Sequence, residues 1–395
     1  MKEKVVLAFS GGLDTSFCAM YLSKEKGMEV HTAIANTGGF SKEELESIEK
    51  KAYALGVKSH KTLDVTADYY QKGIRFMVYG NVLRNNTYPI SVSSERIFQA
   101  FAVIEYAKSI GATHVAHGST GAGNDQIRFD LAFEVLAPEI KIITPTRDLE
   151  LTREAEIDYL RKHGVKDNFE KMAYSINKGL WGTSIGGKET LSSDKTLPEE
   201  AYPTHLQKQG EETLVLGFQK GQLNAVNGKE YKNPVEAIQK IEKIGSAWAV
   251  GRDMHIGDTI IGIKGRVGFE AAAPMLIIKA HQMLEKHTLT KWQQYWKEQL
   301  GNWYGMFLHE AMYLDPVMRD MEKFLENSQE NVTGNVIIKL IPYTFQLVGI
   351  ESDHDLMKSD FAQYGETNKG FTADDAKGFT KILSNQLKIY YSVNK

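Results

Sequence analysis

The sequence predicts an α/β protein that begins with a doubly wound parallel sheet. An apolar run at residues 5–9 passes through two glycines into a helical apolar repeat that ends near Gly27. The same strand-then-helix unit follows at once, with a strand over 30–35 and a helix that a capping box of Ser41 and Glu44 begins. Repeated units of this kind build a parallel sheet with helices on both faces.

The alternation continues through the next hundred residues. A helical repeat carries Ile97, Phe101 and Ile104, and apolar strands follow at 114–118 and 141–145. We therefore expect residues 1–170 to form one α/β domain.

In the second part of the chain, patterns typical of antiparallel β-hairpins replace the alternation of strands and helices. Lys220-Gly221 separates two apolar runs, and Asn233 followed by Pro234 predicts the start of a helix. A polar stretch at 192–203 is typical of a surface loop. The predicted hairpins join 213–219 to 222–226 and 336–342 to 344–351. Residues 171–370 are therefore expected to form an α+β domain.

The C-terminal residues 371–395 predict an amphipathic helix. Thr372 and Asp375 begin it, and an apolar stripe follows. The stripe consists of Phe379, Ile382, Leu383 and Leu387. Because a helix at the end of a chain must bury such a stripe somewhere, we expect it to pack on another subunit.

Composition excludes several classes of function. The 395 residues carry a formal net charge of −3, which gives no general attraction to nucleic acid or to anionic membranes. Cys18 is the only cysteine, so an intramolecular disulfide, a Cys-rich zinc site and a two-cysteine sulfur relay are excluded. There is no apolar stretch of membrane-spanning length. We expect a cytoplasmic protein that acts on small polar molecules, with neither nucleic acid nor membrane as partner.

The string AFSGGLDTS, residues 8–16, lies where the first strand turns into a helix. Two glycines let the backbone curl with its N–H groups on one side, and the helix N-terminus adds its partial positive charge. The hydroxyls of Ser10, Thr15 and Ser16 can complete a phosphate cradle, and Asp14 fits a magnesium ion bridging to the phosphates. The alternative is that Asp14 only caps the helix.

This string resembles the pyrophosphate loop of the ATP pyrophosphatases, which cleave ATP between its α and β phosphates and adenylate a substrate oxygen. It lacks the spacing of a Walker loop and of a dinucleotide-binding fold. The resemblance implies that the N-terminal domain has the adenine nucleotide alpha-hydrolase-like fold.

Four further strings resemble the argininosuccinate synthase family, and the similarity runs nearly end to end. They are NTYPISVSSER (86–96), AHGSTGAGNDQIRFD (116–130), SINKGLWGTS (175–184) and WAVGRDMHIGDTIIGIKGR (248–266). The resemblance implies an AMP-forming C–N ligase of arginine biosynthesis that acts as a homotetramer. Its reaction would convert ATP, citrulline and aspartate into argininosuccinate, AMP and pyrophosphate through a citrullyl-adenylate. Residues 171–370 would then be the synthetase domain.

The resemblance also implies roles for individual residues. It places Asp14 near the magnesium pyrophosphate, and we add the hypothesis that Asp125 accepts the proton of the attacking amine. ATP would be held by Ala8, Phe9, Ser10, Gly11, Gly12, Leu13, Asp14, Thr15, Ser16, Ala35 and Gly118. Aspartate would be held by Thr120, Asn124 and Asp125, and citrulline by Tyr88, Ser93, Asn124, Arg128, Ser175 and Ser184.

The chain departs from the family pattern around the expected citrulline site. Gly257 stands where the family places a glutamate that meets the α-ammonium group, and Phe269 stands where it places a tyrosine. Further departures are Asn177, Gly179, Gly186 and, in the nucleotide loop, Ala122. These losses favour an alternative substrate, a citrulline with an acetylated or succinylated α-amino group, whose acyl group Lys188 could meet. The other possibility is that Asp258 restores the lost negative charge and the substrate is ordinary citrulline. A lower-ranked alternative function is that of a non-catalytic nucleotide-binding regulator.

Overall fold

Five parallel strands form the N-terminal sheet in the order β3-β2-β1-β4-β5. The structure is a computed structural model that describes residues 2–121, 123–166, 174–361, 364–365 and 370–394. The strands are β1 (Lys4–Ala8), β2 (Glu29–Asn36), β3 (Ser59–Asp64), β4 (His114–Ala116) and β5 (Lys141–Ile143). The predicted doubly wound sheet is confirmed. The strand order reverses at β1, so the carboxyl ends of β1 and β4 form the switch point at which such sheets bind ligands.

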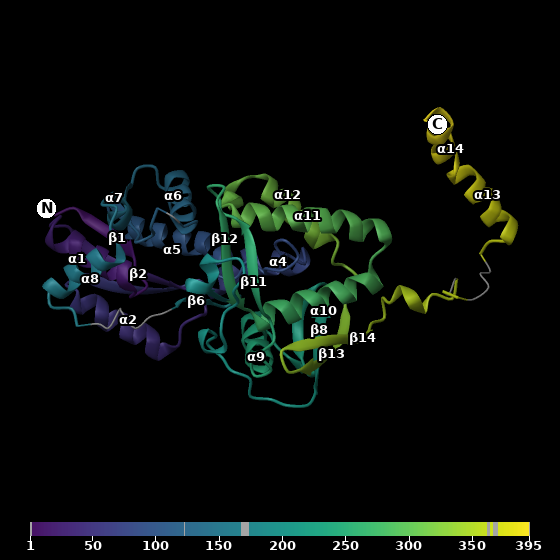
Figure 1. Cartoon of the computed structure of the whole chain (residues 1–395), viewed down its shortest axis with the longest axis horizontal. Helices are drawn as coiled ribbons and strands as arrows, with labels where there is room; N and C mark the ends of the chain where they lie inside the picture. The colour runs from purple at the N-terminus through teal and green to yellow at the C-terminus, as the bar shows by residue number, and fades with distance from the viewer. Residues whose placement is uncertain (1, 122, 167–173, 362–363, 366–369, 395) are drawn as a thin grey trace.

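Helices cover both faces of this sheet (Figure 1). Val6 of β1 packs in one apolar cluster with α5, whereas Val5 and Leu7 pack in another with α1 and α8. Alternate residues of a strand point to opposite faces, which is why Val5, Val6 and Leu7 of the first strand are all apolar. The helical elements of this region are α1 (Leu13–Lys24), α2 (Lys42–Ala54), α3 (Thr66–Tyr69), the π-helix η1 (Tyr70–Ile74), α4 (Arg75–Tyr79), the 3₁₀ turn η2 (Ser93–Glu95), α5 (Arg96–Ser109), α6 (Asp125–Leu136), α7 (Pro145–Asp148) and α8 (Arg153–Lys162).

Two antiparallel sheets form the second part, as the hairpin signals predict. One has the order β11-β12-β7-β6 and the other the order β10-β9-β8-β13-β14. The strands are β6 (Ser175–Gly179), β7 (Gly182–Gly186), β8 (Glu212–Gln219), β9 (Gln222–Val226), β10 (Lys229–Glu230), β11 (Arg252–Asp258), β12 (Lys264–Glu270), β13 (Gly334–Ile341) and β14 (Thr344–Glu351). The helices are α9 (Pro234–Ser246), α10 (Ala272–Thr288), α11 (Lys291–His309) and α12 (Val317–Asn327), with 3₁₀ turns η4 (Lys188–Leu191), η5 (Glu199–Ala201), η6 (Met312–Leu314) and η7 (Leu356–Lys358).

The two parts meet where the β6–β7 hairpin packs against the loop that follows β2. The backbone N–H of Leu180 donates to the carbonyl oxygen of Thr37 at 3.1 Å. A side chain at Gly39 would collide with the backbone of Lys178, so the contact needs a glycine there. This junction brings the second part next to the carboxyl ends of the parallel strands. The predicted domain boundary at 170/171 lies outside the described residues.

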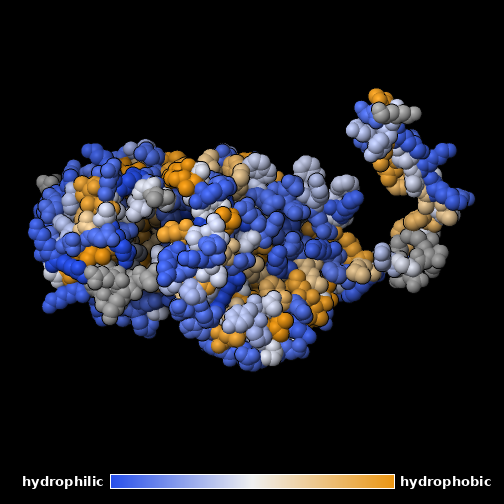
Figure 2. Space-filling view, viewed as in Figure 1, coloured by the Kyte–Doolittle hydropathy of each residue, from blue (hydrophilic) through white to orange (hydrophobic). Residues whose placement is uncertain are grey.

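The C-terminal segment stands clear of the body of the molecule (Figure 1). The expected single helix is two, α13 (Ala373–Leu383) and α14 (Asn385–Val393), and the predicted capping box of Thr372 and Asp375 is present. None of the described residues of either helix is buried, and Figure 2 shows apolar side chains on this segment facing solvent.

Candidate active site

The loop between β1 and α1 has the geometry of an anion cradle. Gly11 adopts φ +77°, and the Lys51 ammonium donates to its carbonyl oxygen at 2.7 Å. The hydroxyls of Ser10 and Thr15 lie 3.4 Å apart beside Gly12, the N-cap residue of α1. Within the described residues no side chain caps this helix, so its first N–H groups are available to a ligand. Asp14 lies in the first turn, and the alternative that it caps the helix is wrong.

The residues predicted to hold ATP come together at this edge of the sheet. A side chain at Gly118, which follows β4, would lie 3.1 Å from the backbone of Asp14 and Thr15. The N–H of Phe9 donates to the carbonyl oxygen of Ala33 at 2.8 Å, which places Ala35, near the end of β2, at the same edge. The structure thus brings 8–16, Ala35 and Gly118 together, as a nucleotide site requires.

Asp14 faces a small buried polar group on α7 and α8. Thr146 donates to Glu156 at 2.9 Å, and Cys18 lies 3.6 Å from the Thr146 hydroxyl. Burial, together with the neighbouring Asp14 carboxylate, raises the pKa of Glu156 to about 8. Burial also raises the pKa of Cys18 to about 12, so its thiol is protonated and is no nucleophile at neutral pH.

The loop after β4 is held in place by a chain of polar contacts. His117 Nδ1 accepts from the N–H of Ser119 at 3.2 Å, and its Nε2 lies 2.8 Å from Asp130. Asp130 in turn pairs with Arg147 at 2.6 Å. Because His117 is bonded on both nitrogens, its ring orientation is fixed and the start of the loop is fixed with it.

Asp125, the first residue of α6, lies between two arginines. Arg96 Nε donates to its Oδ2 and Arg128 Nη1 to its Oδ1, both at 2.8 Å. Burial raises the pKa of Asp125, but the two guanidinium groups outweigh it and hold the pKa at about 2. Such a carboxylate does not take up a proton at neutral pH. The geometry therefore argues against the hypothesis that Asp125 accepts the amine proton.

Arg128 is buried, and three of its donor atoms are engaged inside the protein. Besides Asp125, its Nε and Nη2 both donate to the carbonyl oxygen of His309 at 3.1 Å. The predicted citrulline contact is thus a clamp between α6 and the end of α11. Asn124 is also engaged, since its Oδ1 accepts from the N–H of Ile260 at 2.9 Å.

Two of the residues predicted to hold citrulline lie in direct contact. The Tyr88 hydroxyl lies 3.1 Å from the Ser184 hydroxyl and donates to the carbonyl oxygen of Ser91 at 2.5 Å. Ser175 pairs with Gly186 across the β6–β7 hairpin, which places it on the same face as Ser184. The side chains of Ser175 and Thr120 are exposed, and the Ser93 hydroxyl donates to the carbonyl oxygen of Ile90 at 3.2 Å.

The departures from the family pattern lie beside Tyr88. The rings of His255 and Phe269 pack on Tyr88 with centroids 5.0 and 5.4 Å away, and a side chain at Gly257 would meet His255 Nε2 at 2.7 Å. Phe269 pairs with Asp253 across the strands, so it shares a face with His255 and Gly257.

Asp258 points to the opposite face of this sheet. It pairs with Lys264 at 2.7 Å and is exposed, so it does not supply the carboxylate that Gly257 lacks. Lys188 is exposed and pairs with Glu189 at 3.9 Å. Burial, together with the nearby Arg84, lowers the pKa of His255 to about 4, so this ring is neutral at neutral pH. Ala122 lies outside the described residues.

Comparison with known proteins shows which family this chain belongs to. The family model described as the arginosuccinate synthase N-terminal HUP domain matches residues 4–166, and the arginosuccinate synthase C-terminal domain matches 174–390. The chain belongs to the argininosuccinate synthase family. It is accordingly an ATP-dependent ligase with a pyrophosphate loop, as the sequence predicts.

Relatives within the argininosuccinate synthase family align over the whole chain. The argininosuccinate synthase of Methanocaldococcus jannaschii is 36% identical over 393 residues, which cover 99% of this chain and 98% of that protein. The argininosuccinate synthase of Xylella fastidiosa is 35% identical, and the alignment covers 100% of this chain and 98% of that protein. That of Pyrococcus furiosus is 34% identical, and the alignment covers 99% of this chain and 95% of that protein. Within the described residues, no helix is long and apolar enough to cross a membrane.

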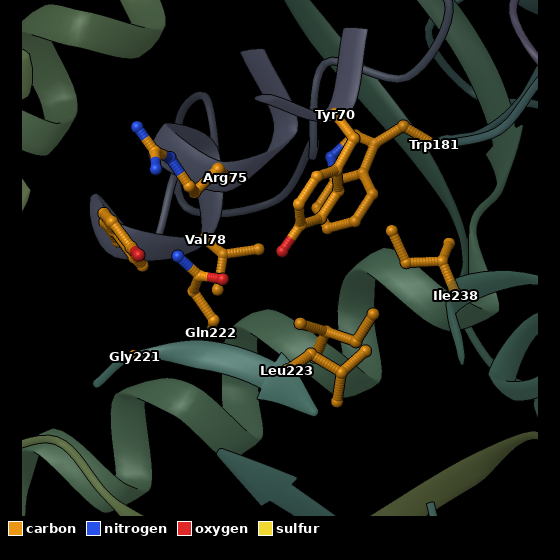
Figure 3. Close-up of a pocket in the computed structure, with 10 residues that line it drawn as sticks. Tyr70, Arg75, Val78, Trp181, Gly221, Gln222, Leu223 and Ile238 are labelled. Atoms are coloured by element: carbon orange, nitrogen blue, oxygen red, sulfur yellow. The ribbon is translucent and has the colours of Figure 1, made fainter. Parts of the chain in front are cut away.

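One small pocket lies apart from this site. Trp181, Leu223 and Ile238 point into it together with Tyr70 (Figure 3). None of the predicted site residues lines it. It lies between η1, α4, β9, α9 and α10.

Sequence reasoning missed four members of the site: Arg96, His117, Arg147 and His309. Arg96 and His117 lie within two of the strings that carry the family resemblance, but no pattern in the sequence marks them as site residues. Arg147 follows β5 and so emerges at the ligand-binding edge, which is a usable signal. His309 contributes a backbone carbonyl, which no side-chain pattern reveals.

Proposed function

We propose that this protein is an argininosuccinate synthase, which joins citrulline to aspartate at the expense of ATP. The observation that carries the proposal is the contact between Gly118 and the Asp14–Thr15 backbone, which joins the pyrophosphate loop to the loop that leads to Asp125. One bound nucleotide at this contact would reach both loops. Full-length similarity to proteins named argininosuccinate synthase supports the same reaction.

The residues suggest an order of events. The loop 10–16 would receive the β and γ phosphates through its N–H groups and hydroxyls while the ureido oxygen of citrulline attacks the α phosphorus. The aspartate amine, held near Thr120 and Asp125, would then attack the activated carbon and release AMP. Most of the acceleration would come from positioning, since Asp125, with its pKa at about 2, is a very weak proton acceptor.

Asp14 is the residue that would hold magnesium. Its carboxylate, the Ser10 and Thr15 hydroxyls beside it and the phosphates themselves are all oxygen donors, which this ion prefers. When bound, magnesium would neutralise charge on the departing pyrophosphate.

The residues of the proposed citrulline site are compatible with the alternative substrate, an acylated citrulline. His255 is neutral, Arg84 lies close enough to lower its pKa, and Asp258 faces away. Asp253 is exposed on the same face of β11 and is the carboxylate available there to an α-ammonium group, whereas an acylated, uncharged nitrogen needs none. An Nα-acetyl or Nα-succinyl citrulline thus stays our second candidate substrate.

The assembly is proposed to be a homotetramer in the cytoplasm. The exposed apolar residues of α13 and α14 need a partner surface, and a second copy of the chain supplies one in a symmetric assembly. The regulator alternative is disfavoured by the intact phosphate loop.

The test measures pyrophosphate and AMP release by the purified protein with ATP, magnesium and aspartate. Citrulline is compared with its Nα-acetyl and Nα-succinyl forms, and omission of aspartate is the control. Turnover with citrulline supports the first proposal. Turnover with an acylated form alone supports the second candidate, and no turnover with any of the three contradicts both.

A further inference from the structure

Glu95 is a buried carboxyl group that the proposed reaction does not use. It ends η2 immediately before α5, and only 1% of its surface is exposed. Its Oε1 accepts from Gln99 Nε2 at 3.3 Å and from Arg96 Nη1 at 3.4 Å. Its Oε2 makes no hydrogen bond of standard geometry within the described part of the chain. A half-satisfied carboxyl group in the interior is costly and calls for a function.

Glu95 lies at the junction of the two parts of the chain. Its Oε2 rests against Gly179 of β6, where any side chain would collide with it. The Thr37 hydroxyl, from the loop after β2, is buried beside it and favours the ionised form. Gly179 is one of the departures from the family pattern, and the position of Glu95 explains why this chain has no side chain there.

Arg96 connects Glu95 to the proposed aspartate site. The same guanidinium that contacts Glu95 donates through Nε to Asp125 Oδ2 at 2.8 Å. Arg96 is therefore shared between two carboxyl groups, and the contact to Asp125 is the shorter one. Whatever charge Glu95 carries competes with Asp125 for this arginine.

The charge on Glu95 changes near neutral pH. Burial raises its pKa to about 7; Arg96 and Thr37 act in the opposite direction, while Asp125 adds to the rise. Among the described residues, Tyr69 of α3 also faces Glu95; burial raises its pKa well above 10, so this hydroxyl stays neutral.

We propose that Glu95 is a positioning residue for aspartate: it shares Arg96 with Asp125, and its ionisation weakens the hold of the site on the dicarboxylate substrate. With Glu95 neutral, the group Glu95, Arg96, Asp125 and Arg128 carries a net charge of +1, from two guanidinium groups and one carboxylate. With Glu95 ionised the net charge is zero. The neutral form therefore attracts the carboxylates of aspartate more strongly. This inference rests on the proposed function.

The test is the pH dependence of KM for aspartate in the wild type and in Glu95→Gln. We expect the wild-type KM to rise about fivefold between pH 6 and pH 8, the size of a modest coupling between sites. In Glu95→Gln, KM for aspartate should stay at the value that the wild type has at pH 6. The ratio of wild-type KM to variant KM should therefore rise from about 1 at pH 6 to about 5 at pH 8. KM for ATP should change less than twofold in the same range, which a merely structural role would not produce.

Two further variants complete the design. Glu95→Asp retains a titratable group and should retain a pH-dependent KM, whereas Glu105→Gln, on an exposed position of the same helix, should match the wild type. A wild-type KM that is flat between pH 6 and 8 overturns the proposal, even where Glu95→Gln does not fold. So does a Glu95→Gln profile that parallels the wild type, or a rise in KM for ATP that parallels the rise for aspartate. Failure of the proposed function is distinct, since the wild type would then form no argininosuccinate.

Discussion

Gly118 and Asp14 are more than one hundred residues apart in sequence, yet a Cβ atom on Gly118 would lie 3.1 Å from the Asp14 carbonyl carbon. This contact fixes the distance between the pyrophosphate loop and the loop that leads to Asp125. The neighbour on one side is backbone at the start of α1, which cannot move without displacing the first-turn N–H groups.

Gly118→Ala should therefore weaken ATP binding more than folding. We expect kcat/KM for ATP to fall about tenfold, the effect of a displacement of a few tenths of an ångström in a positioned site. Steady-state kinetics checks this, with Gly349→Ala as control, because a Cβ atom there meets open space. An unchanged kcat/KM for ATP in Gly118→Ala would show that the two loops do not act together.

Arg128→Lys should destabilise the protein although the charge is kept. Lysine cannot reproduce the two bonds to the His309 carbonyl oxygen together with the bond to Asp125. We expect a loss of about 2–4 kcal/mol, in the range for breaking a buried, hydrogen-bonded charge pair, and hence a lower midpoint of thermal unfolding. Arg147→Lys, at a half-buried arginine, is the matched comparison and should lower the midpoint less. Equal midpoints for the two variants would contradict the clamp.

Asp125 should contribute stability that is lost only in strong acid. Its pKa in the folded chain is about 2, below the ordinary value of 3.8, so the folded state binds its proton less readily than the unfolded state. The contribution is complete above pH 4 and disappears as pH falls from 4 towards 2. Thermal unfolding of the wild type and of Asp125→Asn between pH 2 and 6 measures it. The gap between their midpoints should narrow below pH 4, and a gap that is constant over this range contradicts the assignment.

The sequence could supply the elements of the site but not the pairings between them. The strand at 5–9, the glycine turn and the capping box at Ser41 are local patterns, and each appears within a residue or so of its predicted place. The strand β3 was missed because SHKTLD has no apolar run and no clear alternation.

Contacts between residues far apart in the sequence could not be predicted from local patterns. The family resemblance implies that Arg128 contacts citrulline, but its partners in the structure include a carbonyl oxygen 181 residues away. The hypothesis that Asp125 accepts the amine proton follows from its expected place beside the aspartate amine. Only the structure shows the two arginines that remove its basicity. Likewise, Gly179 is a departure in sequence and a necessity once Glu95 is placed.

Gly179→Ala should be destabilising only while Glu95 is present. The new Cβ atom would collide with Glu95 Oε2, and overpacking of this kind costs about 1–3 kcal/mol. In a Glu95→Ala background the space is free, so the same substitution should cost much less. A double-mutant cycle measured by thermal or urea unfolding tests this, and additive effects of the two substitutions would mean that they do not touch.

The C-terminal helices should be needed for assembly but not for the fold of one chain. Leu383 and Leu387 are each 64% exposed, so replacing both by aspartate removes no packing within the chain. If the apolar surface of α13 and α14 is buried against another copy, the two charges must be desolvated there, and association should be abolished. Light scattering after size-exclusion chromatography gives the mass, with Lys388→Gln on the exposed surface of α14 as control. We expect the double variant to run as a smaller species while the control keeps the wild-type mass. A double variant with the wild-type mass would place the subunit interface elsewhere on the molecule.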